Sequence, residues 1–119
     1  MKIRIDKLDV LFSKVIRKRA ALNFCGCEYC GAQTRLQCSH FVGRRKRATR
    51  WDMDNACGLC FTCHQYLDEH PYEHTAYFTK RLGTEKLEEL VRKGNMIVKI
   101  DRDLMEIYLK RQLELLGGE

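Results

Sequence analysis

The N-terminal part of the chain carries apolar side chains at helical spacing. Over residues 6–22, leucine, phenylalanine, valine and isoleucine recur three or four positions apart, while Lys14, Arg17 and Lys18 lie on the other side of the pattern. Such spacing places the apolar side chains on one face of a helix. We therefore predict an N-terminal helix over 6–22 whose apolar face belongs to the protein core.

The C-terminal half repeats this periodicity and contains residues that begin or end helices. Pro71 ends one helix, because the residue before a proline avoids the helical region, and Gly83 ends the next. Thr84 and Asp101 can each cap a further helix at its N-terminus. These signals predict helices from about 62–64 to 70, from 72 to 82, from 84 to about 94 and from 101 to 116.

The segment between these helical regions has little helical periodicity and contains every cysteine. LQCSHFV, residues 36–42, is typical of a short strand. A second strand over ACGLC is less clearly indicated, because this stretch is short and poor in β-branched residues. The pattern as a whole predicts an α+β fold that is mainly helical.

Four of the seven cysteines form two Cys-x-x-Cys pairs, CEYC at 27–30 and CFTC at 60–63, with 29 residues between them. Disulfides are not expected in a reducing compartment, and a redox motif needs no second copy. Each pair can supply two thiolates from one tight turn, and a zinc ion binds four such ligands in a tetrahedron. We predict a structural Zn²⁺ site formed by Cys27, Cys30, Cys60 and Cys63, with Cys25 as an alternative to Cys27 and with Cys38 and Cys57 as small buried residues.

Length and composition set the organisation of the chain. At 119 residues, with 45% apolar residues, eight glycines and one proline, it is expected to be one ordered domain. No apolar run approaches the roughly 20 residues of a membrane span and no signal-peptide pattern is present, so we expect a cytoplasmic protein without a membrane partner. The single domain, 1–119, is predicted to comprise the N-terminal helix (6–22), a zinc-knuckle core (25–70) and the C-terminal helices (71–119).

The net charge of +6 is concentrated in two places. Arg17 and Lys18 lie near the end of the first predicted helix, and an RRKR run at 44–47 with Arg50 follows the predicted strand. A solvated, inert basic face is the usual explanation of such runs. Because the RRKR run lies next to a candidate metal site, however, we expect it to contact a polyanion.

Two histidines, an asparagine and an aspartate lie between and after the cysteine pairs. His40 stands in CSHF, Asn55 follows fifteen residues later, and His64 comes directly after the second cysteine pair. Asp68, four residues after His64, falls on the same face of the predicted helix. Either histidine alone could be an ordinary core or surface residue. Their combined spacing favours a catalytic site.

In order and spacing, His40, Asn55 and His64 resemble the motif of the HNH nucleases, the ββα-metal or His-Me finger group. The resemblance implies a zinc-stabilised ββα-metal core with flanking helices. Phosphodiester hydrolysis requires a base that is neutral near pH 7, and His40 is expected to be that base. It also requires a cation, Mg²⁺ or Mn²⁺, for which His64 and Asp68 are the expected ligands. Asn55 is expected to hold the intervening loop, so that a backbone carbonyl orients His40.

One position departs from the pattern of this group. Many HNH enzymes place a metal-binding residue immediately before the base, where this chain has Ser39. The ion would then be held by His64, Asp68, water and the DNA phosphate, with Cys38 as a substitute ligand. The alternative interpretation is a non-catalytic zinc-knuckle module that binds DNA through a degenerate HNH site.

The flanking sequences are similar to those of the phage NinG (Rap) recombination protein family. The similar stretches are LDVLFSKVIRKRAA, CSHFVGRRKRATRWDMDN and GTEKLEELVRKG…DLMEIYLKRQLELL, from about Leu8 to Leu116, and the most specific part is 40–63. The resemblance implies a structure-selective endonuclease acting on branched recombination intermediates, such as Holliday junctions and D-loops. That family usually has asparagine at the position of His64, so this residue brings the chain nearer to ordinary HNH enzymes.

The basic loop and one aromatic residue are the expected DNA contacts. Arginine pairs with phosphate without reading sequence, and an indole can stack on an unpaired base at a branch. For the tryptophan, packing against the core is the alternative. Symmetrical cutting of a junction calls for two active sites and would suit a homodimer. The predicted contacts are Arg44, Arg45, Lys46, Arg47, Arg50, Trp51, Arg17 and Lys18.

Overall fold

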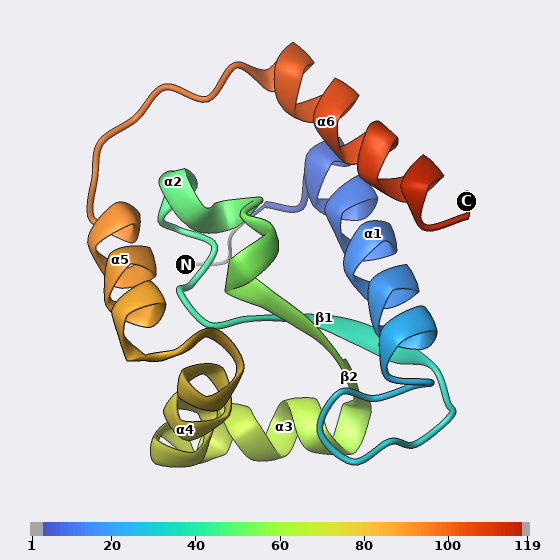
Figure 1. The fold of residues 1–119 in the computed structure, drawn as a ribbon. Coiled ribbons are helices and arrows are strands. Elements are labelled where there is room, and N and C mark those ends of the chain that lie inside the picture. Colours follow the sequence, from blue (N-terminus) through green and yellow to red (C-terminus); the bar gives the residue numbers. More distant parts are fainter. Residues whose placement is uncertain (1–3, 118–119) are drawn as a thin grey trace.

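The computed structural model describes residues 4–117. Its helices surround a small two-stranded sheet, so the fold is mainly helical, as predicted (Figure 1). In chain order the elements are α1 (Lys7–Asn23), β1 (Leu36–His40), α2 (Arg47–Arg50), the 3-10 turn η1 (Met53–Asn55), β2 (Ala56–Cys60), α3 (Phe61–Glu69), α4 (Pro71–Leu82), α5 (Thr84–Gly94) and α6 (Arg102–Leu115).

Helix α1 is the N-terminal helix that the apolar spacing predicts. The Asp6 carboxylate accepts hydrogen bonds from the backbone N–H groups of Leu8 (2.7 Å) and Asp9 (3.4 Å), and the Asp9 carboxylate accepts one from the Asp6 N–H (2.9 Å). This reciprocal arrangement is a capping box, which fixes the start of the helix. The apolar face that α1 buries consists of Leu8, Phe12, Val15, Ile16 and Ala20.

Strands β1 and β2 pair in antiparallel register, with Cys38 opposite Gly58 and His40 opposite Ala56. Strand β1 ends at His40, short of the predicted end at residue 42. Strand β2 is the stretch that the sequence indicated less clearly, and it is buried along its whole length. Most of its side chains are small, which lets other elements pack closely against both faces of the sheet. The strand preferences of individual residues do not reflect this packing.

Helix α1 lies directly against β2 at Gly58. A Cβ atom on Gly58 would lie 2.7 Å from the Cβ of Ala20 and 3.5 Å from the carbonyl oxygen of Ile16. Real Cβ atoms do not approach this closely, so a side chain at this position would force the helix away from the strand.

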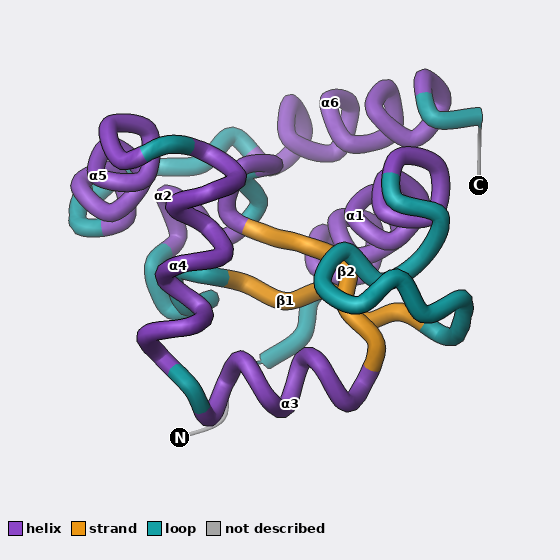
Figure 2. The backbone as a smooth tube through the Cα atoms, turned by 60° about the horizontal axis from the view of Figure 1, so that its bottom comes forward, coloured by secondary structure: helices purple, strands orange, loops and turns teal. Residues whose placement is uncertain are grey.

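Two apolar clusters fill the space on either side of the sheet. One contains the buried face of α1 together with Trp51, Ala56 and Leu109, and it is covered by α6. The other contains Cys57 and Leu59 of β2 with buried side chains of α3, α4 and α5. Figure 2 shows α1 and α6 side by side, away from α3 and α4.

The C-terminal helices begin and end close to their predicted positions. Pro71 is the first residue of α4, and the Asp101 carboxylate caps α6 by accepting a hydrogen bond from the Leu104 N–H (3.1 Å). The prediction for Thr84 was wrong by one residue: Gly83 is the cap of α5, because its φ of 90° makes the turn out of α4. Within residues 4–117, no helix combines the length and the apolar character needed to cross a membrane.

Replacing Gly58 with alanine is expected to destabilise the fold by about 1–3 kcal/mol, because the added methyl group overpacks the contact between α1 and β2. Chemical denaturation measures this change. The control is Gly43→Ala, since a Cβ at Gly43 meets nothing within 4 Å and an exposed substitution costs about 0.5 kcal/mol or less. Adding Ala20→Gly to the Gly58→Ala variant should recover part of the loss. Equal stabilities of the two single variants would contradict the close packing.

Candidate functional site

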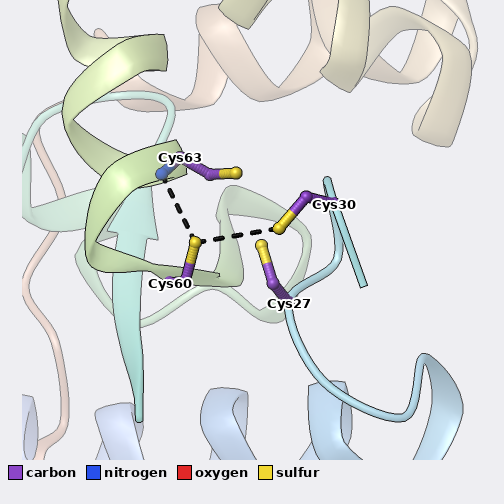
Figure 3. A group of neighbouring side chains, drawn as sticks. All are labelled: Cys27, Cys30, Cys60 and Cys63. Carbon is purple, nitrogen blue, oxygen red and sulfur yellow. Dashed lines mark hydrogen bonds between the residues drawn. The ribbon is translucent and has the colours of Figure 1, made fainter. Parts of the chain in front are cut away.

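Four cysteine sulfur atoms gather where the 27–30 turn meets the junction of β2 and α3 (Figure 3). The Sγ atoms of Cys27, Cys30, Cys60 and Cys63 all lie within 4.8 Å of one another, and those of Cys30 and Cys60 are 3.8 Å apart. A tetrahedral zinc ion with Zn–S bonds of about 2.3 Å separates its sulfur ligands by roughly 3.8 Å. The cluster can therefore bind one zinc ion. Cys25 is exposed and lies outside this group.

The backbone of the first cysteine pair is shaped to bring its sulfurs together. Gly26 has a φ of 145°, and a Cβ there would lie 2.5 Å from the carbonyl oxygen of Ala32. Burial opposes ionisation of the Cys27 thiol, but hydrogen bonds from neighbouring backbone groups, those of Cys30 and Cys60 first, outweigh it and lower its pKa to about 7. Burial and the neighbouring cysteine side chains raise the pKa of Cys63, so Cys27 loses its proton more readily than Cys63 and is the better suited of the two to begin metal binding.

A buried carboxylate ties this turn to β2 and α4. The Glu28 side chain is fully buried, and it accepts hydrogen bonds from the Gly58 N–H (2.7 Å), the Tyr77 hydroxyl (2.9 Å) and the Arg81 guanidinium (2.8 Å). Arg81 offsets its charge, without which a buried carboxylate is strongly disfavoured. Sequence analysis missed Glu28, whose only signal is its place between the cysteines of the first pair.

A cleft of about 650 Å³ opens between α1, β1 and α3. It brings together five predicted site residues that are far apart in the sequence. His40 comes from the end of β1, and His64 and Asp68 come from one face of α3. Arg17 comes from α1, and Arg44 comes from the loop after β1. The predicted site residues that line the cleft are His40, His64, Asp68, Arg17 and Arg44.

His40 is held by the loop that follows it. Its Nε2 lies 2.9 Å from the carbonyl oxygen of Arg50. Because a carbonyl oxygen only accepts, this contact places the hydrogen on Nε2 and leaves the lone pair of the neutral ring on Nδ1. Burial lowers the pKa of His40 below its ordinary value, with the charge of Arg44 acting in the same direction, although the Arg50 carbonyl opposes them. The ring is therefore neutral at pH 7.

Asn55 holds the loop whose carbonyl contacts His40. The Asn55 side chain is fully buried, and its Oδ1 accepts a hydrogen bond from the Val42 N–H (2.7 Å). Its Nδ2 donates to the carbonyl oxygens of Val42 and Thr49, each at 2.9 Å. These bonds join the start of the loop after β1 to α2, and Thr49 directly precedes the residue whose carbonyl meets His40. Asn55 thus acts on His40 through the backbone.

His64 projects from the first turn of α3 into the same cleft. Its Nδ1 lies 2.7 Å from Oε1 of Gln37, and its Nε2 lies 3.6 Å from Oδ2 of Asp68. The amide oxygen of Gln37 accepts the Nδ1 hydrogen, so the neutral ring presents the lone pair of Nε2 beside the Asp68 carboxylate. This is the tautomer that a metal-binding histidine needs, with a second residue fixing its orientation. Sequence analysis missed Gln37, because alternation along β1 places it on the face opposite His40 and its partner His64 lies on α3.

The residues before His40 do not add a ligand to the cleft. Ser39 is fully buried, so it cannot reach an ion there. Burial raises the pKa of the Cys38 thiol to about 12 and also raises that of Cys57, so both stay neutral. Among residues 4–117, one group of three or more potential ligand side chains converges on a single point, and it consists of the four cysteines. In this part of the chain, His64 and Asp68 form a pair without a third histidine, cysteine or carboxylate at that spacing.

The predictions that Trp51 and Arg50 contact DNA were wrong, because both side chains are buried. Trp51 is 2% exposed and Arg50 is 7% exposed. The Asp9 carboxylate accepts hydrogen bonds from the Trp51 indole (3.0 Å) and from two nitrogens of Arg50 (2.9 and 2.5 Å). These contacts hold the C-terminal end of α2 against α1, so both side chains have a structural role.

The other predicted basic residues lie at or near the surface. Arg44 lines the cleft and lies 3.5 Å from the Asp9 carboxylate, and Arg17 lines it from α1, where its Nε donates to the Ser13 hydroxyl (3.1 Å). Lys18 is partly exposed. The exposed members of the basic loop are Arg45, Lys46 and Arg47.

Comparison with known proteins identifies no relative of this chain: no protein-family model, curated protein or solved structure matches it. The contacts and charges described above are therefore the basis for assigning a function.

Purified protein is expected to contain about one zinc ion per chain, because four thiolates converge on one tetrahedral position. Cys60→Ser should lose most of this zinc and unfold at a lower temperature, since Cys60 links the two halves of the cluster. Metal analysis and thermal unfolding measure both effects. Cys25→Ser is the matched control and should keep its zinc. Retention of zinc by Cys60→Ser, or its loss from Cys25→Ser, would contradict the assignment.

Proposed function

We propose that this protein is a metal-dependent DNA endonuclease of the HNH type that acts on branched recombination intermediates, such as Holliday junctions and D-loops. The observation that carries the proposal is the cleft that brings together His40, His64 and Asp68 under arginine side chains. The preference for branched DNA comes from the resemblance to the NinG family, since no contact in the cleft specifies DNA shape.

The chain order of the elements supports this proposal. Strand β1 ends at His40, strand β2 returns beside it, and α3 follows β2 without a gap, with His64 in its first turn. The HNH resemblance calls for this succession of two strands and a helix around one metal site. We accordingly propose that β1, β2 and α3 form a ββα-metal core, with the four-cysteine cluster as its structural zinc site.

His40 is the proposed general base. The ring is neutral at pH 7, and the Arg50 carbonyl holds its Nε2–H. Its Nδ1 lone pair can then take a proton from the water that attacks the phosphodiester phosphorus. Asn55 is a positioning residue, because it acts only by fixing the loop that carries this carbonyl. The leaving oxygen would be O3′, so the products would carry a 5′-phosphate and a 3′-hydroxyl.

His64 and Asp68 are the proposed ligands of a catalytic Mg²⁺ or Mn²⁺ ion. The Nε2 lone pair of His64 and Oδ2 of Asp68 lie 3.6 Å apart on one side of the cleft, which suits two ligands of one ion. Such an ion, when bound, offsets the charge that develops on the phosphate and the leaving oxygen. Gln37 keeps His64 in the ligand tautomer. Water and a substrate phosphate would supply the remaining ligands.

The basic side chains around the cleft are the proposed phosphate contacts. Arg17 and Arg44 line it, and Arg45, Lys46 and Arg47, which follow Arg44 in the chain, are exposed. Arginine binds phosphate without reading the base sequence, so these contacts would position the backbone over His40. A non-catalytic DNA-binding module remains the second candidate, because Ser39 supplies no ligand where many HNH enzymes have one.

His40→Ala is expected to abolish cleavage of a labelled four-way junction in Mn²⁺, a loss of about 100-fold or more, because no other side chain replaces the base. Affinity for the junction should stay near the wild-type value. The control is His70→Ala, whose histidine is exposed on the far end of α3 and should leave both unchanged. Normal cleavage by His40→Ala would contradict the assignment of His40 as the base. A wild-type protein that binds the junction but never cuts it would favour the binding module.

The pH dependence of cleavage should reflect the lowered pKa of His40. The neutral ring is the active form, so the rate rises as pH increases through this pKa and then levels off. Because burial lowers the pKa below its ordinary value of about 6.5, the plateau should already be reached near neutral pH. Single-turnover cleavage between pH 5 and 8 tests this. A midpoint above pH 7 would mean that another group is titrating.

A further inference from the structure

A second cavity, of about 610 Å³, lies between the first cysteine turn and α4, apart from the histidine cleft. Its walls carry several aromatic rings. Phe24 and Tyr29 are each 42% exposed, and the ring of Tyr29 meets that of Tyr77 edge to face with centroids 5.9 Å apart. Large aromatic side chains around an open cavity expose apolar area to water, which makes the cavity a candidate binding site. We call it the tyrosine pocket.

The tyrosine pocket offers a ring to stack on and a cation at its edge. Glu28 is buried in its floor, where the Tyr77 hydroxyl donates to its carboxylate and Arg81 offsets its charge. Glu73 also lines the pocket and accepts a hydrogen bond from the Tyr29 hydroxyl (3.4 Å). Lys80 lines the pocket and is exposed. An exposed aromatic ring and an ammonium group in the lining of one pocket match a nucleotide, in which a flat base is attached to a phosphate.

Helix α3 lines the histidine cleft and passes beside the tyrosine pocket. His64 and Asp68 line the histidine cleft, while Tyr66 lies on the side of Tyr29, with ring centroids 6.4 Å apart. Figure 1 shows α3 running from the β2 end to α4, which forms the other wall of the tyrosine pocket. One DNA molecule spanning α3 could therefore contact both cavities.

We propose that the tyrosine pocket binds an unpaired nucleobase of branched DNA, with Tyr29 stacking on the base and Lys80 contacting an adjacent phosphate. In intact duplex every base is paired and stacked, so only a flap, branch point or single strand can fill the pocket. This assigns to the pocket the role that buried Trp51 cannot have, and it gives a physical source for selectivity towards branched DNA. The inference rests on the proposed function in taking DNA as the substrate.

Ala76→Glu tests the proposal without disturbing the cysteine cluster. Ala76 is exposed on α4 and lines the pocket, so a glutamate there fills it and repels a nucleotide. Thr75→Glu is the matched control, because it adds the same charge one residue away at an exposed position outside the pocket. Fluorescence anisotropy with a 5′-flap DNA and a linear duplex, without added magnesium or manganese, measures binding independently of cutting.

Ala76→Glu should weaken flap binding by about 5- to 150-fold, the range for loss of one base–aromatic stack, and should change duplex binding no more than Thr75→Glu does. Tyr29→Ala should have the same effect while keeping its zinc, and Tyr29→Phe should bind normally. Equal weakening by Ala76→Glu and Thr75→Glu, or an equal loss on duplex, overturns the proposal. If the wild type never cuts DNA but Ala76→Glu loses flap binding, the proposed pocket is supported and the proposed nuclease activity is contradicted. If the wild type cuts DNA and Ala76→Glu binds the flap normally, the nuclease activity is supported and the pocket is contradicted.

Discussion

The arrangement of the candidate site depends on the convergence of four sulfur atoms at one point. The cluster joins the 27–30 turn to the place where β2 becomes α3, since Cys60 is the last residue of the strand and its sulfur also accepts the Cys63 N–H (3.5 Å). His64 comes next in the chain, so whatever fixes this junction also fixes the direction of its ring. A metal ion bound here would crosslink two distant segments of a small core, and Glu28 adds a second link at the same place.

The second half of the site is positioned by uncharged and charged hydrogen bonds rather than by metal. Asn55 fastens the start of the loop after β1 to α2, and Asp9 fastens the end of α2 through Arg50 and Trp51. The result is a backbone carbonyl pointing at His40. Two independent devices, one based on sulfur and one based on buried polar side chains, thus bring the two histidines into one cleft.

Sequence could predict the features that depend on local spacing. The helices follow from apolar periodicity, and the cysteine cluster follows from two Cys-x-x-Cys pairs. Burial of individual polar residues could not be predicted in this way: Arg50 belongs to a basic run, yet its partner Asp9 lies forty-one positions earlier in a different element. Gln37 escaped notice for a related reason, since its role exists only where β1 and α3 come together. When the role of a side chain depends on a distant partner, that role can be identified only from the folded structure.

The most direct test of the account is incubation of the wild-type protein with end-labelled four-way junction, flap and linear duplex DNA in Mg²⁺ or Mn²⁺. The account predicts cutting of the junction and flap and much slower cutting of the linear duplex. Binding of all three DNAs with no cutting in either ion would contradict it. The cleft would then hold DNA without acting on it.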